Sequence, residues 1–188
     1  MNVYDPYPDH VTVDGKSYRI ETNYDRFLRA VDVYDMPDLT TSDKLRLQCR
    51  LLLAGGKVPK NPETQSAIVR AVFKMMPKKG SETYEKYMDL HQDAPLIRSA
   101  FRRIGIDLSR DKVHFLQFFE LLGDLPSDTA LMRTIEIRAR KIPQPTKYNQ
   151  EEILALQEAK ARVALEMTDD ERRERFSASL KNSTVLRG

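Results

Sequence analysis

The fold of this chain is determined by one stretch near its middle, Asp93–Arg138, with the sequence DAPLIRSAFRRIGIDLSRDKVHFLQFFELLGDLPSDTALMRTIEIR. Inside it, the run Val113–Leu125 has apolar side chains pointing in most directions when it is treated as a helix. A helix that is apolar nearly all round must be buried. The run is shorter than the roughly 20 residues that cross a bilayer, so we expect it to pack among other helices or against another subunit.

Short polar residues and a glycine mark the ends of three helices in this stretch. The predicted starts are Asp93 for the first helix, Asp107 or Ser109 for the aromatic helix, and Ser127 or Asp128 for the third. Gly105 is predicted to end the first helix. The apolar side chains of the third helix are predicted to be Leu131, Ile135, Ala139 and Ile142.

The N-terminal part predicts a hairpin followed by helices. Val11–Ile20 is predicted to pair two short strands through Asp14-Gly15, because this dipeptide supplies the positive backbone dihedrals of a two-residue turn. The period then becomes that of a helix, whose apolar face is predicted to hold Tyr24, Phe27, Leu28, Val31 and Tyr34. Two later helices are predicted to start at Thr40, with Asp43 completing a capping box, and at Asn61-Pro62-Glu63.

The C-terminal part predicts a linker and an extension. Ile142-Pro143-Gln144-Pro145 is typical of a linker, and Asn149 is predicted to cap a helix from Gln150 to Leu165. The tail beyond it has few apolar residues, so we expect it to project, fray or become ordered on a partner. The predicted fold is mostly α, a compact domain of about six helices with an N-terminal β-hairpin and a C-terminal helical extension. Its predicted parts are an arm (1–10), the hairpin and helical core (11–142), the linker (143–149) and the extension (150–188).

The composition is that of an ordinary globular protein. The 31 Lys and Arg exceed the 28 Asp and Glu by only 3, and these charges are spread along the chain, so we do not expect nucleic acid as a partner. The single cysteine, Cys49, cannot form an internal disulfide and is expected to be a packed thiol. The N-terminus shows no signal-peptide pattern and no stretch is long and apolar enough to span a membrane, so we expect the cytoplasm.

Residues that could carry chemistry are few. The three histidines, His10, His91 and His114, have no second ligand at helical spacing, so we predict neither a metal site nor a cofactor site. We predict no catalytic residues and do not expect an enzyme. The arginines at 98, 102 and 103 form either a basic patch over aromatic residues or an ordinary solvated helix face.

A set of residues also matches a known pattern in order and spacing. Its members are Tyr87, Asp89, Leu90, Asp93-Ala94, Leu96-Ile97, Ala100-Phe101, Gly105-Ile106-Asp107-Leu108, His114, Phe118, Leu121-Leu122, Leu125, Asp128-Thr129 and Ile137-Arg138. With the opening hairpin and the segment Lys160–Leu165, the chain resembles, from about Val11 to Leu165, a family of small tail-assembly chaperones. These come from long-tailed phages and prophages of Gram-positive hosts. The chain departs from the family at Phe115-Leu116, where two tryptophans usually follow the histidine.

The resemblance implies a non-enzymatic protein in the cytoplasm of the host bacterium. It would bind the long helical tape-measure protein, help recruit tail-tube subunits around it, and self-associate. Its gene would lie between the tail-tube and tape-measure genes. An apolar groove bordered by helices at 94–104 and 110–122 is the expected contact surface. The residues predicted to bind the partner are Phe101, Phe115, Leu116, Phe118, Phe119, Arg98, Arg102 and Arg103.

Two other functions remain open at this point. The first is a structural tail or connector component that stays in the virion. The second is a DNA-binding regulator that uses the helices at 94–104 and 110–122 as a helix-turn-helix. The apolar character of the second of these helices disfavours a regulator, because base contacts need Arg, Asn or Gln.

Overall fold

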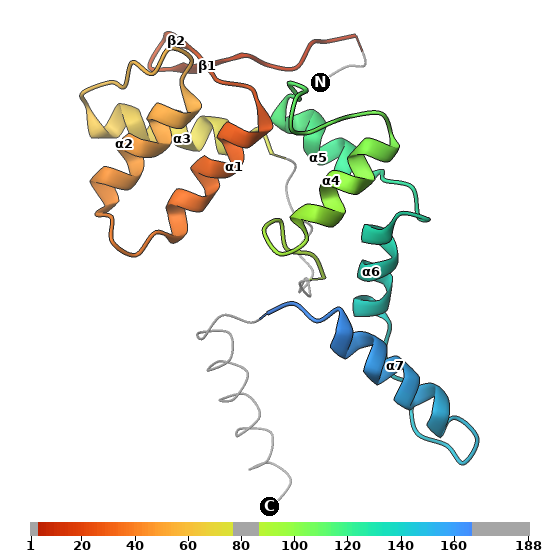
Figure 1. The fold of residues 1–188 in the computed structure, drawn as a ribbon. Coiled ribbons are helices and arrows are strands. Elements are labelled where there is room, and N and C mark those ends of the chain that lie inside the picture. The colour runs from red at the N-terminus through yellow and green to blue at the C-terminus, as the bar shows by residue number, and fades with distance from the viewer. Residues whose placement is uncertain (1–3, 77–86, 167–188) are drawn as a thin grey trace, which may run out of the picture. The chain divides into compact units, whose positions relative to one another are not determined.

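The computed structural model describes residues 4–76 and 87–166 and confirms the mostly helical fold class. In these residues the chain forms seven α-helices, one short 3-10 helix and an N-terminal two-stranded hairpin (Figure 1). The contacts divide the chain into two units, Met1–Thr83 with Phe101–Leu125 and Tyr84–Ala100 with Pro126–Gly188. None of the helices described is both long enough and apolar enough to span a membrane.

The predicted hairpin opens the first unit. Strand β1 (His10–Val13) pairs antiparallel with β2 (Lys16–Arg19), and Val11 lies opposite Tyr18. Asp14 and Gly15 adopt φ angles of 50° and 72°, as a two-residue turn with positive dihedrals requires. A lone hairpin is marginal in water. Here the end of the hairpin is held on the helices by two hydrogen bonds of the backbone, from Glu21 to Leu52 (2.8 Å) and from Ala54 to Arg19 (3.0 Å).

Three helices of the first unit follow the predicted pattern. They are α1 (Tyr24–Asp32), α2 (Thr41–Leu52) and α3 (Pro62–Phe73). The Thr40 hydroxyl accepts a hydrogen bond from the Asp43 N–H (3.2 Å), and the Asn61 side chain accepts one from the Glu63 N–H (2.8 Å), so both predicted caps are confirmed. Tyr34 was wrongly placed on the apolar face. The chain tightens into a 3-10 helix at Val33–Asp35, which buries Val33 and leaves Tyr34 73% exposed.

The aromatic helix is shorter than predicted. Helix α5 spans Phe115–Gly123 and is capped by His114, so neither Asp107 nor Ser109 starts it. Asp107 instead accepts hydrogen bonds from the Ser109 N–H (3.0 Å) and hydroxyl (2.6 Å) within a separate turn. Short polar residues favour such local turns as readily as helix caps, and sequence spacing does not distinguish the two.

The second unit contains α6 (Ala130–Ala139) and α7 (Gln150–Arg162), which pack against each other. The cap of α6 is Thr129, whose hydroxyl accepts from the Met132 N–H (3.2 Å), and not Ser127 or Asp128. Ile142 lies beyond the end of α6 and is exposed, which corrects its predicted place on the helix. The Asn149 side chain makes no capping bond to α7. Predictions for the tail after residue 166 lie outside the described residues.

Helix α4 spans Ala94–Arg103. Its residues up to Ala100 belong to the second unit, and those from Phe101 belong to the first. Gly105 terminates this helix, as predicted. Gly105 has φ +85°, its N–H donates to the Arg102 carbonyl (3.0 Å), and the Ile106 N–H donates to the Phe101 carbonyl (3.0 Å). This pair of bonds is the Schellman motif, which requires the left-handed conformation that glycine adopts most easily.

Replacing Gly105 with alanine should therefore destabilise the protein. A side chain at φ +85° is strained even though nothing lies within 4 Å of the added carbon. We expect the free energy of unfolding, measured by urea denaturation, to fall by about 1–2 kcal/mol. Gly123→Ala is the matched control, because that glycine also has open space but no positive φ. Equal losses in the two variants would contradict the assigned role of Gly105.

Candidate functional site

Most of the apolar residues predicted to bind a partner lie in the core of the first unit. Phe101 and Phe115 are completely buried, and Leu116 and Phe118 nearly so. Phe119 is half-buried and packs against the same core. A partner could reach the four buried side chains only if this unit opened. The assignment of these residues to a groove stays a prediction, and Phe119 is the member at the surface.

The buried rings are arranged in stacks. Phe27 of α1 stacks on Phe115 of α5 with centroids 4.6 Å apart and planes 5° apart. The ring of Phe118 stacks with the ring of Tyr24, with centroids 4.8 Å apart, and with the ring of Phe101, with centroids 5.2 Å apart. Aromatic pairs at such separations stabilise a fold by more than the burial of their apolar surface alone. The aromatic run of the sequence thus supplies the packing of the first unit.

The three predicted arginines lie at the surface of α4. Arg98, Arg102 and Arg103 are all exposed. Acidic residues follow directly in the next turn. The pKa of Asp107 is lowered, first by its hydrogen bonds with Ser109 and then by the nearby charges of Arg110 and Arg102. This carboxylate weakens the positive field that a basic patch would need.

His114 joins the N-terminal arm to the start of α5, a role that the sequence did not indicate. Its Nδ1 accepts the Leu116 N–H (3.1 Å) and its Nε2 lies 3.1 Å from the Pro8 carbonyl oxygen. Nδ1 must carry no proton to accept, and Nε2 must carry one to donate, so both bonds require the neutral ring. The ring also stacks on Tyr7 (4.9 Å) and Phe115 (4.6 Å).

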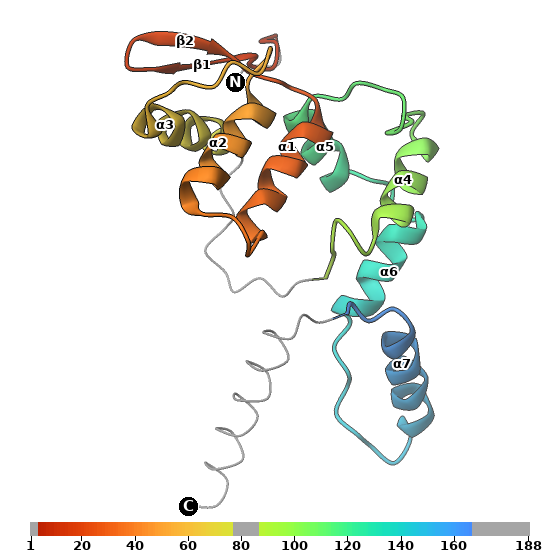
Figure 2. The ribbon, with the colours of Figure 1, turned by 60° about the vertical axis from the view of Figure 1, so that its left-hand side comes forward.

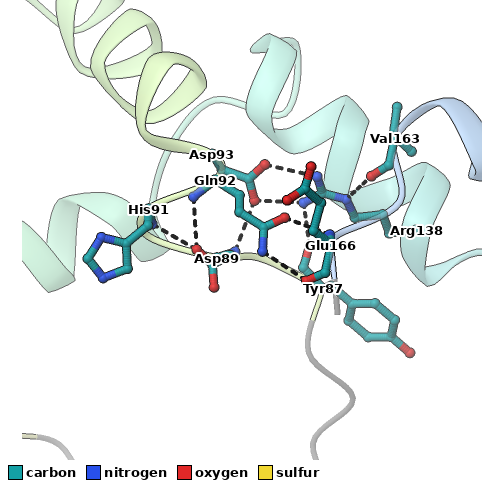
Figure 3. A network of polar contacts seen from close by, with 8 residues as sticks. All are labelled: Tyr87, Asp89, His91, Gln92, Asp93, Arg138, Val163 and Glu166. Atoms are coloured by element: carbon teal, nitrogen blue, oxygen red, sulfur yellow. Dashed lines mark hydrogen bonds and ion pairs between the residues drawn. The ribbon is translucent and has the colours of Figure 1, made fainter. Parts of the chain in front are cut away.

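A second polar network holds the second unit together (Figure 3). Arg138 of α6 forms two hydrogen bonds with the Asp93 carboxylate, at 2.6 and 2.9 Å. The side chains of Arg138 and Asp93 are only 11% and 3% exposed. The sequence predicts a helix cap at Asp93 and gives no sign of its ion pair with Arg138, although both residues belong to the matched pattern. Their separation of 45 positions leaves no periodic signal.

The same arginine also collects backbone carbonyls. It donates to the carbonyl oxygens of Tyr87 (3.0 Å) and Val163. Nearby, Gln92 and the backbone of Glu166 exchange two hydrogen bonds, at 3.0 and 2.7 Å. Figure 3 shows these contacts joining the segment before α4, helix α6 and the residues after α7. The network fixes three separated segments at one point.

The second unit also exposes large apolar side chains near its α6–α7 connection. Ile142 is 45% exposed, Tyr148 is 93% exposed and Leu154 is 58% exposed. We call the connection Arg140–Tyr148 the tip loop. Every residue of the tip loop is exposed. Helix α7 buries Leu156 alone, so the described residues of this unit leave most of its surface uncovered. These exposed apolar side chains make this part of the second unit a candidate contact surface.

The chemistry of the remaining candidates is limited. Burial raises the pKa of the Cys49 thiol to about 11, and the thiol donates weakly to the Gln65 carbonyl (3.4 Å). It is therefore a packed thiol and not a nucleophile at neutral pH. In residues 4–76 and 87–166, no group of three or more His, Cys, Asp or Glu side chains is placed to hold a metal ion.

The His114 contacts predict a loss of stability at mildly acidic pH. Burial lowers the pKa of His114 below its ordinary value of 6.5, against the opposing effect of the Pro8 carbonyl. The unfolded chain therefore takes up a proton first as the pH falls, and stability present above about pH 6.5 is lost below it. His114→Asn keeps a capping acceptor that does not titrate, so its unfolding free energy should change less between pH 7.5 and 5.5.

The reference for this measurement is the pH dependence of the unfolding free energy of the unmodified chain, from urea titrations at each pH. If His114→Asn shows that dependence as well, protonation of His114 does not limit stability.

The Arg138 network predicts a large loss of stability when one partner is removed. Arg138→Met keeps an apolar stem but leaves the Asp93 carboxylate buried without its counterion. Breaking a buried pair in this way costs about 3–5 kcal/mol. Arg162→Met removes an exposed ion pair with Glu158 and should cost about 0.5 kcal/mol or less. Thermal and urea unfolding would measure both, and losses of similar size would show that the Arg138 network contributes little.

Comparison with known proteins gives a family match. Searches of curated proteins and of solved structures found none. The model of a protein family described as Bacteriophage Gp15 protein matches residues 3–165, which is most of the 188-residue chain. This range contains the hairpin, the seven described helices, the His114 contacts and the Arg138–Asp93 pair. The chain belongs to the Bacteriophage Gp15 protein family.

Proposed function

We propose that this protein is a non-enzymatic tail-assembly chaperone of its phage. It acts in the cytoplasm of the host bacterium, binds the tape-measure protein and helps recruit tail-tube subunits. Membership of a phage protein family supports the phage context. The resemblance of residues 11–165 to tail-assembly chaperones supports the specific role.

The structural observation that carries this proposal is the exposed apolar surface of the second unit. Tyr148 and Leu154 are more than half exposed, while α7 buries only one side chain. A newly made tape-measure protein exposes long apolar helical faces that would aggregate. An under-covered helical hairpin offers such faces a place to pack, in the manner of helix-in-groove recognition. Modest affinity per copy allows later displacement by tail-tube subunits, and many copies along one chain compensate for it.

The environment of α5 argues against the DNA-binding alternative. A recognition helix must present polar side chains to base edges. Helix α5 buries Phe115, Leu116, Phe118 and Leu122, and its exposed residues include Glu120. A carboxylate on the open side repels the phosphate backbone. These features favour a protein partner.

Co-expression with the tape-measure protein of the same phage tests the proposal. The tape-measure protein should move from the insoluble to the soluble fraction when this chain is present, because its apolar faces are covered. The two proteins should co-purify with several copies of this chain per tape measure. Gel electrophoresis of both fractions and light scattering of the complex are the measurements.

The control is the tape-measure protein expressed alone and with the tail-tube protein. Equal solubility with and without this chain, and no co-purification, would refute the chaperone role. Mass spectrometry of purified particles distinguishes the structural alternative. A chaperone leaves before the tail is complete, so finding this chain at stoichiometric amounts in the virion would favour a tail component.

A further inference from the structure

The tip loop is the long connection between α6 and α7. Figures 1 and 2 show it leaving the end of α6 and passing to the far end of α7. All residues from Arg140 to Tyr148 are exposed. This loop leaves both of its large apolar residues, Ile142 and Tyr148, at the surface.

Hydrogen bonds within the loop hold its shape. The Asn149 side chain accepts from the Thr146 N–H (2.6 Å) and donates to the Gln144 carbonyl (2.9 Å). Pro143 and Pro145 each fix one backbone dihedral. Asn149 therefore closes the loop where the sequence predicted a helix cap. A loop ordered before binding loses less entropy when a partner arrives.

Tyr148 lies directly before Asn149, the N-cap residue of α7, where an apolar side chain often packs on the helix. It precedes the first residues of α7 in the position from which an apolar side chain often packs on the fourth helical residue, here Ile153. Its exposure of 93% shows that this contact is not made. A tyrosine ring on a rigid loop offers a large contact area at low entropic cost, which is the character of an interface anchor.

The charged residues of the tip loop are all positive. Arg140, Lys141 and Lys147 are exposed, and no residue among those described forms an ion pair with them. The loop contains no acidic residue. It therefore presents three cations beside two apolar side chains, a combination complementary to carboxylates that flank an apolar residue.

We propose that the tip loop is the contact surface for an acidic segment of the partner protein that carries a large apolar side chain. The partner's carboxylates lie against Arg140, Lys141 and Lys147, and its apolar side chain packs on Tyr148 and Ile142. This inference rests on the proposed function, since the segment belongs to the tape-measure protein. Nucleic acid fits less well, because the 31 Lys and Arg exceed the 28 Asp and Glu by only 3 and are spread along the chain.

Binding to overlapping labelled peptides from the tape-measure protein tests this inference, with fluorescence polarisation as the readout. The full-length chain should bind peptides in which Asp or Glu flanks a large apolar residue. Tyr148→Ser and the double variant Lys141→Glu, Lys147→Glu should each weaken that binding by about tenfold or more. Circular dichroism and thermal melting verify that both variants remain folded.

The first unit supplies matched controls. Tyr34→Ser removes another exposed tyrosine, and the double variant Lys57→Glu, Lys60→Glu makes the same charge change on exposed lysines. Both controls should bind the peptides within about twofold of the unmodified chain. The co-expression assay repeated with each variant shows whether the loop is needed for solubilisation.

Each result has a defined consequence. Equal binding by the tip-loop variants and the unmodified chain, with solubilisation intact, would overturn the loop assignment and leave the proposed function standing. An unmodified chain that neither binds a peptide nor solubilises the tape measure would overturn both. Tight, salt-dependent binding of a DNA duplex that is lost in the double lysine variant would overturn the assignment to a protein partner.

Discussion

The first unit depends on the stacking of Phe27 in α1 on Phe115 at the start of α5. Their rings lie nearly parallel at 4.6 Å, and both side chains are buried. Helix α5 is apolar on almost every side, so it is stable only where other elements cover it. Two backbone hydrogen bonds place it. The Phe115 N–H donates to the Thr22 carbonyl (2.8 Å), and the Tyr24 N–H donates to the Val113 carbonyl (2.9 Å). The aromatic core and the ends of two helices thus meet at one place.

The second unit is organised by charge more than by packing. Its helices α6 and α7 bury one leucine each, Leu131 and Leu156. The guanidinium of Arg138 satisfies a carboxylate and two carbonyl oxygens that come from separated segments. A buried ion pair adds little net stability compared with apolar packing, because both charges must leave water. The planar guanidinium of Arg138, however, donates in fixed directions, so it favours one arrangement of its acceptors.

This difference between the units bears on function. The stacked rings of the first unit are buried in its core, so the aromatic run that dominates the sequence contributes to stability. The unit with the smaller core leaves Tyr148 and Leu154 exposed, and the cations of the tip loop form no ion pair with the described residues. Under the proposed function the protein holds a helical partner and later releases it, and a surface of this limited kind suits the modest affinity that release requires.

The sequence by itself determined the local features of this protein. The Asp14-Gly15 turn, the caps at Thr40 and Asn61, and the end of α4 at Gly105 all follow from backbone and side-chain chemistry within a few residues. Hydrophobic periodicity likewise determined the helical class, and the order of matched residues pointed to a phage family.

Only the tertiary structure decided which side chains are buried in a core and which are exposed. Whether Phe115 lines a groove or the core depends on Phe27, and the role of Asp93 depends on Arg138, 45 positions away. His114 became a cap because the chain around Asn23 pairs with it and prevents an earlier helix start. Periodicity reports the direction of a side chain relative to its own helix. The element that covers it comes from elsewhere in the chain, so its burial is a property of the whole fold.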